Sequence, residues 1–441
     1  MGNYTREQIM DMVDDEDVEF IRLQFTDMFG NLKNIAVTSS QLEKALDNLC
    51  TIEGSSIEGF DRSGEEDLYL HPDLDTFCIL PWRPQQGKVA RFLCDVYHAD
   101  GKPLKESSRY IFRQVLKEAE KLGYTFRAEP ECEFFLFHTD ENGIPTTLTH
   151  EKAGYLDIGP MDLGENARRD IVLTLEEMGF EIESSHHEVA PAQHEIDFRY
   201  GKGMKIADDV MTFKMAVRTV AKRHGLHATF MPKPKADVNG SGMHMMMTLT
   251  KDGKNVFYDG KDKNGLSKEA YYFIGGILKH IRGMCLVTNP LVNSYKRLVP
   301  GFEAPTALSW SVKNGSHLLR IPSGKGENCK IELKSPDASA NPYLTLALCL
   351  AAGLDGIRNR IEPVEPVKER FDQLPGEVQD SFEKMPGTLQ EAILAFEKDE
   401  FVQEVLGKGF CRQYLRAKKQ EWMEYTRQVS QWELEQYLYC N

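Results

Sequence analysis

The spacing of apolar side chains predicts three amphipathic helices in the first half of the chain. Residues 107–123 carry apolar side chains at every third or fourth position, and a glycine ends the pattern. The same period runs through residues 167–178 and 208–224, each followed directly by a glycine. Because glycine just past the last periodic residue favours helix termination, all three segments are predicted as helices with defined ends.

Shorter apolar runs between these helices predict strands. The runs cover residues 20–25, 126–137, 180–185, 195–200 and 243–249. Several are joined by hairpin-length or glycine-rich connections, which favours an antiparallel sheet over a doubly wound parallel one. The pattern therefore predicts an α+β fold.

A turn-forming stretch divides the pattern into a small part and a large part. Residues 99–103 read Ala-Asp-Gly-Lys-Pro, and Ser107 or Ser108 is placed to cap the helix that follows. A chain of 441 residues is long enough for two or three domains. We expect a small α+β domain over residues 16–100 and a larger domain over residues 107–441.

Composition excludes several classes of function. The formal net charge is −15 and no basic stripe is present, so a nucleic-acid partner is not expected. The N-terminus lacks the features of a signal peptide, and no uncharged run is long enough to span a bilayer, so we expect no membrane partner. Nine scattered cysteines without a C-x-x-C pair suit a reducing compartment, and a cytoplasmic location is expected.

Two glutamates stand out within a strongly apolar segment. Glu131 and Glu133 are two residues apart, so in a strand they would lie on the same face. Burial and mutual repulsion would raise their pKa values unless a cation between them kept both ionised. The segment therefore indicates a metal site, with two solvated glutamates on an edge strand as the alternative.

Two further segments supply acidic and imidazole groups. Glu188 and Glu195 flank an Ala-Pro-Ala turn that is able to return the chain on itself, so both side chains are placed to face one cavity. His244 follows a glycine-rich loop and leads into a strand-like run. Oxygen ligands with a single imidazole suit Mg²⁺ or Mn²⁺ better than a structural zinc.

A basic stretch rich in glycine follows near residues 295–334. Metal-bound carboxylates without a serine or cysteine triad favour phosphoryl chemistry, which needs positive groups to offset the charge on the transferring oxygens. No Walker-type phosphate loop is present, so any nucleotide is held in another way. The positive side chains of this stretch are Lys296, Arg297, Lys313, Arg320, Lys325, Lys330 and Lys334.

These segments, in this order, resemble the bacterial type I glutamine synthetases, and their length is similar to that of the alpha subgroup. The resemblance runs from about residue 16 to the C-terminus. Its motifs are EGSSIEGF at 53–60, PECEFFLF at 130–137, HHEVA at 186–190, QHE at 193–195, NGSGMH at 239–244, NP at 289–290, VPGFEAP at 299–305 and NPYL at 341–344.

The resemblance implies a fold, an assembly and a metal site. It implies an N-terminal β-grasp domain, a larger catalytic domain, and a homo-oligomer of twelve subunits in two stacked hexameric rings with active sites between neighbours. Two metal ions, Mg²⁺ or Mn²⁺, are implied. The ligands are then Glu133, Glu188 and Glu195 for one ion and Glu131, His244 and Glu332 for the other.

The resemblance also implies the substrates and their contacts. Glutamate, ATP and ammonia or another small amine would react through a γ-glutamyl phosphate, with Glu303 on a flap that excludes water. Glutamate would contact Asn239, Gly240, Arg297 and Lys334. ATP would contact Glu183, Tyr200, Thr248 and Lys330, with Arg320 near its phosphates and Glu53 at the amine.

Two departures from the family pattern leave alternatives open, and Lys325, Lys330 and Lys334 also stand at positions where the family has arginine. Glu53 stands where the family has an aspartate that binds ammonium, and Gly315 stands where it has an arginine on the transferring phosphoryl group. The expected activity is a glutamate–ammonia ligase. The alternatives are a γ-glutamyl ligase for another amine and a catalytically weak regulatory paralogue.

Overall fold

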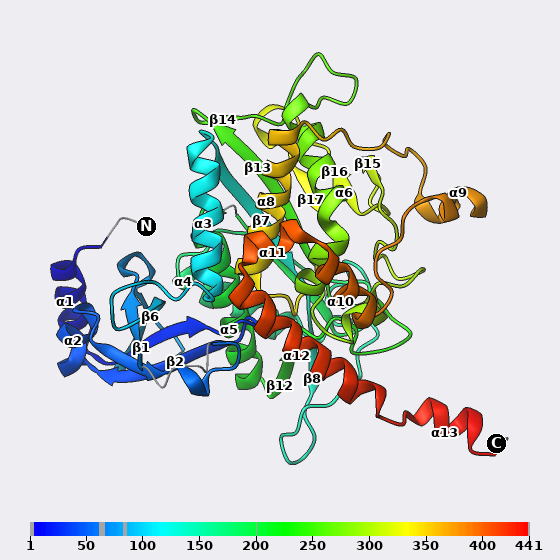
Figure 1. The fold of residues 1–441 in the computed structure, drawn as a ribbon. Coiled ribbons are helices and arrows are strands. Elements are labelled where there is room, and N and C mark those ends of the chain that lie inside the picture. The colour runs from blue at the N-terminus through cyan, green and yellow to red at the C-terminus, as the bar shows by residue number, and fades with distance from the viewer. Residues whose placement is uncertain (1–3, 61–66, 83–85, 200, 440–441) are drawn as a thin grey trace.

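The computed structural model describes residues 4–60, 67–82, 86–199 and 201–439, which form a small N-terminal part beside a larger one (Figure 1). The small part is a sheet in the order β2-β1-β6-β4-β3, with β5 paired to β6. β1 runs parallel to β6 and antiparallel to β2. Its elements are α1 (Arg6–Asp15), β1 (Val18–Thr26), β2 (Leu32–Thr38), α2 (Leu42–Leu46), β3 (Cys50–Glu53), β4 (Asp67–Pro72), β5 (Cys78–Ile79) and β6 (Lys88–Tyr97).

The larger part contains two sheets. The first has the order β12-β8-β10-β9, and all of its pairs are antiparallel. The second has the order β11-β7-β13-β17-β16-β15, with β14 paired to β13, and only β15 and β16 are parallel. The strands are β7 (Thr125–Cys132), β8 (Phe134–His138), β9 (Ile182–His187), β10 (Gln193–Phe198), β11 (Gly201–Lys202), β12 (Leu226–Thr229), β13 (Met243–Lys251), β14 (Lys254–Asn255), β15 (Trp310–Val312), β16 (Leu319–Ile321) and β17 (Ile331–Leu333).

Helices surround these sheets, and the C-terminal helix extends away from the body of the molecule (Figure 1). No helix in the described part of the chain is long and apolar enough to cross a membrane. The helices are α3 (Ser108–Lys121), α4 (Glu165–Glu177), α5 (Lys205–Arg223), α6 (Lys268–Thr288), α7 (Ser294–Arg297), α8 (Pro342–Asn359), α9 (Gly376–Ser381), α10 (Leu389–Lys398), α11 (Glu400–Leu406), α12 (Lys408–Thr426) and α13 (Gln431–Tyr437).

The single strand predicted over residues 126–137 is wrong, because the chain changes sheets within it. β7 ends at Cys132 and belongs to the second sheet, whereas β8 begins at Phe134 and belongs to the first. Glu133 lies at the break, where its backbone N–H donates to the Gly242 carbonyl at 3.1 Å. Glu131 and Glu133 therefore do not share one strand face, although both line the same cavity.

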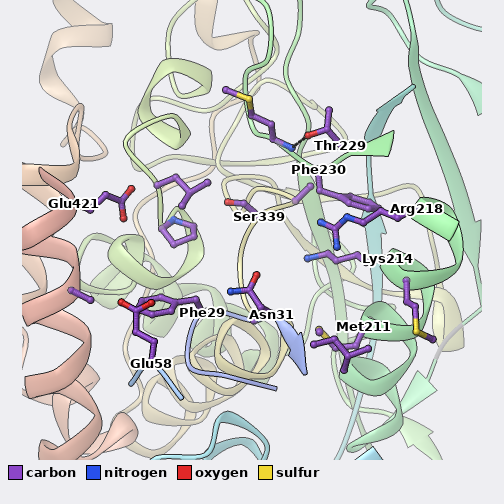
Figure 2. Close-up of a pocket in the computed structure, with 18 of the residues that line it drawn as sticks. Phe29, Asn31, Glu58, Met211, Lys214, Arg218, Thr229, Phe230, Ser339 and Glu421 are labelled. Carbon is purple, nitrogen blue, oxygen red and sulfur yellow. Dashed lines mark hydrogen bonds between the residues drawn. The ribbon is translucent and has the colours of Figure 1, made fainter. Parts of the chain in front are cut away.

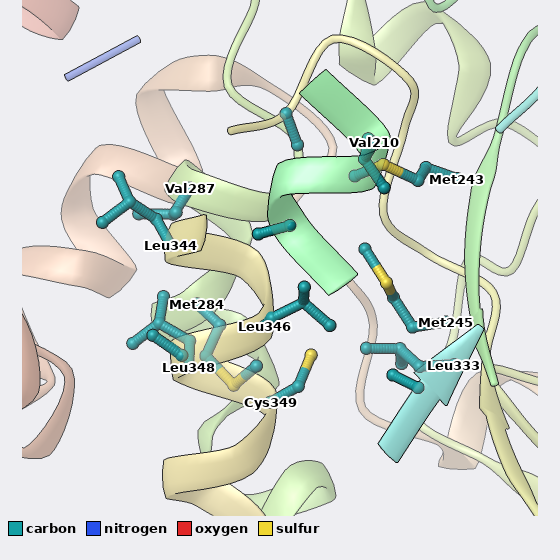
Figure 3. Packing of buried hydrophobic residues seen from close by; sticks show 14 of the residues in the cluster. Val210, Met243, Met245, Met284, Val287, Leu333, Leu344, Leu346, Leu348 and Cys349 are labelled. Atoms are coloured by element: carbon teal, nitrogen blue, oxygen red, sulfur yellow. The ribbon is translucent and has the colours of Figure 1, made fainter. Parts of the chain in front are cut away.

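The two parts have separate hydrophobic cores. One cluster is built around Ile21, Leu70 and Phe92 of the small part, and a larger cluster fills the larger part and also includes Met28 from the turn after β1. Figure 3 shows Leu344, Leu346 and Leu348 of α8 among side chains of α5, α6 and the second sheet. Because these side chains are almost fully removed from water, their burial is the main favourable contribution to folding.

A buried arginine joins the two parts. Arg109, in the first turn of α3, pairs with Asp73 at 2.7 Å and Asp95 at 2.8 Å in the small part. It also pairs with Asp208 of α5 at 2.9 Å. Since an arginine fork makes directional bonds to carboxylates, Arg109 fixes the orientation of the small part against the larger one.

A cavity of about 910 Å³ lies at this junction (Figure 2). Lys214 and Arg218 of α5 face it from one wall, and Glu421 of α12 faces it from the other. Asn31, next to the turn between β1 and β2, also lines it. None of the carboxylates predicted as metal ligands contacts this cavity, so its size does not mark the chemical site.

Candidate active site

Two antiparallel strand pairings bring one group of predicted metal ligands together. Glu131 of β7 lies directly opposite His244 of β13. Glu332 of β17 pairs with Met246, two residues further along β13. The His244 Nδ1 atom consequently lies 3.4 Å from a Glu332 oxygen and 3.6 Å from a Glu131 oxygen. Each of the three side chains offers a ligand atom within 4.8 Å of the others.

A second group forms where β9 turns into β10. Glu188 follows the end of β9, and Glu195 lies in β10 opposite His186. The His186 Nε2 atom is 2.9 Å from a Glu188 oxygen and 3.8 Å from a Glu195 oxygen. These three residues form a second cluster of ligand atoms within 4.8 Å of one another.

Glu133 lies between the β9–β10 turn and the glycine-rich loop before β13. Its Oε2 atom accepts a hydrogen bond from the Gly242 N–H at 2.8 Å and another from the Gln193 amide at 2.9 Å. The same Gln193 amide donates to the Gly240 carbonyl at 3.0 Å. Gln193 thereby fixes Glu133 relative to the loop that was predicted to contact glutamate.

Protein contacts alone disfavour ionisation of these carboxyl groups. Burial and the charge of Asp197 raise the pKa of Glu131 to about 7. Burial and the charge of Glu188 raise the pKa of Glu133 to about 7, and burial and Glu133 raise the pKa of Glu195 well above its ordinary value. Burial and the nearby Lys334 lower the pKa of His244 to about 3.

The donor set fits divalent cations. Carboxylates that repel one another are stabilised in the ionised form by a cation between them, and a neutral imidazole is the form that binds metal. Oxygen ligands with a single histidine suit Mg²⁺ or Mn²⁺. The chemistry of the residues is therefore compatible with a divalent cation at the cluster of Glu131, His244 and Glu332 and another at the cluster of His186, Glu188 and Glu195, while Glu133 lines the same cavity.

All six predicted ligands line one cavity of about 410 Å³, which is also lined by basic side chains. Arg297 is buried, and its guanidinium donates to the carbonyls of Ser335 at 2.8 Å and Lys334 at 3.1 Å. Arg320 of β16 forms an ion pair with Glu332. The cavity therefore brings acidic and basic groups close together, an arrangement that suits phosphoryl transfer to a carboxylate.

The predicted glutamate-binding and flap residues also reach this cavity. The Asn239 amide donates to a Glu303 carboxylate oxygen at 3.0 Å. Glu303 has a positive φ of 54°, a conformation that few non-glycine residues adopt. A Cβ atom on Gly240 would lie 2.1 Å from the Pro232 carbonyl oxygen, so only glycine fits there.

Two positive side chains lie beside Gly315, the position at which the family pattern has an arginine. The Lys334 ammonium donates to the Gly315 carbonyl at 3.0 Å. A Cβ atom on Gly315 would lie 3.4 Å from the Arg320 guanidinium and 3.7 Å from the Lys334 ammonium. Two cations therefore already surround the space that an arginine at position 315 would enter.

Four of the predicted residues, Glu53, Glu183, Thr248 and Lys330, do not line this cavity. Glu53 is exposed at the end of β3 in the small part and accepts a hydrogen bond from Ser55. Tyr200 lies outside the described residues. Thr248 is buried in β13, and Lys330 pairs with Glu129 at 2.5 Å. Burial raises the pKa of Glu129, and the negative charge of Glu183 adds to this rise, which places Glu183 in the same neighbourhood.

Comparisons with known proteins identify the family. The model of the glutamine synthetase catalytic domain matches residues 105–437, and the model of the glutamine synthetase β-grasp domain matches residues 17–99. The chain belongs to the glutamine synthetase family. It is 55% identical over 440 residues to the glutamine synthetase of Clostridium saccharobutylicum, covering 99% of both chains.

Further relatives agree along the whole chain. Glutamine synthetase from Staphylococcus aureus (strain N315) is 51% identical over 438 residues, with 99% of this chain and 98% of that protein covered. A solved structure of GmaS in complex with ADP has a TM-score of 0.89 at 30% identity, covering 98% of this chain and 99% of that one. The expected α+β fold, with a β-grasp domain before a glutamine synthetase catalytic domain, is confirmed.

The cavity of this glutamine synthetase family member contains residues that sequence reasoning did not assign. His186, Tyr155 and Arg370 line or border it, and none of them was predicted as a site residue. Tyr155 stands edge-on to His186, with their ring centroids 5.8 Å apart. Tyr155 comes from the long segment between β8 and α4, whose path the strand pattern does not predict. His186 adjoins a recognised motif, which was the available signal.

Metal affinity should depend on pH because the ligands must lose protons before they bind a cation. With pKa values of about 7 for Glu131 and Glu133, protons compete with the metal below pH 7 and hardly compete above pH 8. The affinity for Mn²⁺ should therefore increase from pH 6 to pH 8 and then level off. Calorimetry in buffers of different ionisation enthalpy should show more proton release at pH 6 than at pH 8; equal release at both would contradict these raised pKa values.

Proposed function

We propose that this chain is an ATP-dependent glutamate–ammonia ligase that acts through a γ-glutamyl phosphate. The observation that carries the proposal is the convergence of six metal-ligand candidates and several basic side chains in one cavity, in a chain that matches glutamine synthetases over 99% of its length. The identities of 51–55% over the full length to proteins named glutamine synthetase favour ammonia over another amine as the acceptor.

The proposed reaction follows from the charges in the cavity. A γ-carboxylate oxygen of glutamate attacks the terminal phosphorus of ATP, and ADP leaves. The nitrogen of ammonia then attacks the acyl carbon, loses a proton, and displaces inorganic phosphate. Asn239, Gly240, Arg297 and Lys334 orient glutamate, and Arg320, with the same Lys334, stabilises the charge on the transferring phosphoryl oxygens. Glu303 closes the cavity against water, which would otherwise hydrolyse the acyl phosphate.

The metal and nucleotide contacts are part of the proposal. Glutamine synthetases depend on ATP and a divalent metal. When bound, Mg²⁺ or Mn²⁺ neutralises phosphate charge and keeps the surrounding carboxylates ionised. Glu131, His244 and Glu332 would hold one ion, and Glu133, Glu188 and Glu195 the other. Glu183, Tyr200, Thr248 and Lys330 would contact ATP.

The finer classification is also a proposal. The chain length and motif order support the alpha subgroup of type I enzymes, and the described cysteines are all free, which suits the cytoplasm. The separate hydrophobic cores support a division between residues 16–100 and 107–441. A homododecamer of two hexameric rings would place Glu53 of one subunit beside the metal cavity of its neighbour.

Subunit mixing tests this shared site. Glu53→Ala and Glu133→Ala subunits should each be inactive as pure oligomers, because each lacks one half of every site. Oligomers assembled from both variants should regain part of the activity, since some interfaces combine two intact halves. Native mass spectrometry verifies that mixed oligomers have formed. Verified mixed oligomers without any recovery would exclude a site shared between subunits.

The activity itself is tested with a panel of amines. Phosphate release should depend on glutamate, ATP and ammonia together, and kcat/KM for ammonia should exceed that for methylamine and ethylamine. A clear preference for a larger amine would replace the proposal by a γ-glutamyl ligase of different specificity. Absence of turnover with any amine, in protein that binds ATP and Mn²⁺, would favour a regulatory role.

A further inference from the structure

We propose that Glu151 is a positioning residue that holds the turn between Glu188 and Glu195 in the shape needed for metal binding. Glu151 lies in the long segment between β8 and α4, is 7% exposed, and does not line the cavity. This inference rests on the proposed function, because it assumes that Glu188 and Glu195 bind a metal ion.

The Glu151 carboxylate contacts both ends of the turn. Its Oε1 atom lies 2.8 Å from the His187 Nε2 atom, immediately before Glu188. The same oxygen accepts a hydrogen bond from the Ala192 N–H, three residues before Glu195. Its Oε2 atom accepts a hydrogen bond from the Leu163 N–H at 3.0 Å, which anchors the carboxylate to its own segment. One side chain thus joins the start and the end of the turn from outside the cavity.

His187 carries this contact to the first metal-ligand candidate. Its ring is fully buried, and its Nδ1 atom lies 2.6 Å from the Glu188 carbonyl oxygen. The ring therefore links Glu151 on one side to the Glu188 backbone on the other. Contacts of this kind, in which an outer group orients a ligand residue, commonly determine metal affinity.

The other end of the turn needs an external contact because its backbone is strained. Ala192 has a φ of 70°, in the left-handed region that favours glycine. A non-glycine residue keeps such a conformation only where its surroundings hold it. The hydrogen bond from the Ala192 N–H to Glu151 is such a restraint, and Pro191 limits the backbone just before it.

Gln193 links this turn to the rest of the site by hydrogen bonds. The Glu188 N–H donates to the Gln193 carbonyl at 2.8 Å, so the two ends of the turn are bonded directly. The Gln193 side-chain amide continues to Glu133 and to the Gly240 carbonyl. A shift of the turn would therefore move a third metal-ligand candidate together with Glu188.

Glu151 also belongs to a buried cluster of acidic and imidazole side chains that resembles a cation site. An arginine already supplies the positive charge of this cluster. Glu151, Asp162, His187 and His194 bring ligand atoms within 4.8 Å of one another. The Arg168 guanidinium lies 2.7 Å from an Asp162 oxygen and 2.9 Å from the His194 Nδ1 atom. The cluster is thus an internal ion pair, which favours a mechanical role for Glu151.

Mn²⁺ titration of the metal-free full-length protein by calorimetry tests the inference. Glu151→Ala should weaken Mn²⁺ binding by about 10- to 100-fold, the usual effect of removing an outer-shell partner. Glu151→Gln should weaken binding less than Glu151→Ala does, because its carbonyl oxygen still accepts from His187 and Ala192, although its amide NH2 cannot accept from the Leu163 N–H. If Glu151→Ala does not fold, His187→Gln, which removes the ring that links Glu151 to Glu188, should show the same weakening.

Asp355→Ala provides the matched control. Asp355 accepts from the buried His280 ring, with its oxygen 2.8 Å from His280 Nε2, in the contact between α6 and α8. This variant also loses a buried carboxylate–histidine contact and should lower the Tm, yet its Mn²⁺ affinity should stay at the wild-type value. A similar loss of affinity in Asp355→Ala would mean that general destabilisation explains the result and would overturn the inference.

A second substitution separates positioning from other roles. Glycine adopts the left-handed conformation of residue 192 without strain, so Ala192→Gly should make the turn less dependent on Glu151. The double variant Glu151→Ala with Ala192→Gly should therefore bind Mn²⁺ several-fold more tightly than Glu151→Ala alone. Wild-type affinity in Glu151→Ala, or no recovery in the double variant, would overturn the inference. Wild-type protein that bound no Mn²⁺ would instead reject the proposed function on which the inference rests.

Discussion

Replacing Glu131 with glutamine should lower glutamine synthesis by about a thousandfold, equivalent to about 4 kcal/mol of transition-state stabilisation. Glutamine keeps the size of the side chain but removes the negative charge that a divalent cation needs opposite His244. Steady-state rates at saturating glutamate, ATP and ammonia measure the loss. Calorimetry should also show weaker Mn²⁺ binding in the same variant.

Glu129→Gln is the matched control for metal binding. Glu129 lies two residues earlier in β7, but it pairs with Lys330 and does not line the cavity. Its substitution should leave Mn²⁺ affinity within about twofold of wild type, a difference of less than 0.5 kcal/mol. Equal affinity in the Glu131→Gln and wild-type proteins would reject the assignment of this metal site.

Lys334→Met should lower kcat by about a hundredfold, the usual effect of losing one well-placed charge on a transition state. Its ammonium lies next to Gly315, where the family pattern has an arginine, and we expect it to supply the missing positive charge. Adding Gly315→Arg to the Lys334→Met protein should therefore raise its kcat about tenfold, equivalent to about 1.4 kcal/mol. In the wild-type protein the same change should give no increase, because Arg320 and Lys334 already occupy the space.

The exposed Lys296 offers a comparison with the same loss of charge. Lys296 precedes Arg297 in the chain but does not line the cavity. Lys296→Met should therefore leave kcat within about twofold of wild type. Stopped-flow measurement of acyl-phosphate formation locates the defect of Lys334→Met in phosphoryl transfer. An unchanged kcat in Lys334→Met would mean that this lysine does not compensate for Gly315.

Periodicity predicted the elements that are regular over many residues. The helices expected over 107–123, 167–178 and 208–224 correspond to α3, α4 and α5, because one apolar face and a terminating glycine define each of them. The strand expected over 126–137 was wrong at its centre. A continuous apolar run does not distinguish one strand from two consecutive strands that enter different sheets, since most residues are buried in either case.

The candidate site was more predictable than its surroundings. Five of its six metal-ligand candidates lie in short motifs, and strand pairing brings motifs distant in sequence to one cavity, as with Glu131 and His244. Glu151 and Tyr155 were not predicted, because they belong to a long segment without regular periodicity, whose position depends on tertiary contacts. The proximity of Lys334 to Gly315 is likewise a property of the folded chain, not of the spacing between the two residues.

Oxygen transfer during turnover tests the account most directly. Glutamate labelled with ¹⁸O in its γ-carboxylate should be incubated with the enzyme, ATP, Mg²⁺ and ammonia, and the released phosphate analysed by mass spectrometry. If a carboxylate oxygen attacks ATP and leaves with the phosphate, each phosphate should contain one ¹⁸O, in a one-to-one ratio with glutamine. Glutamine formed alongside unlabelled phosphate would contradict the acyl-phosphate route at this cavity.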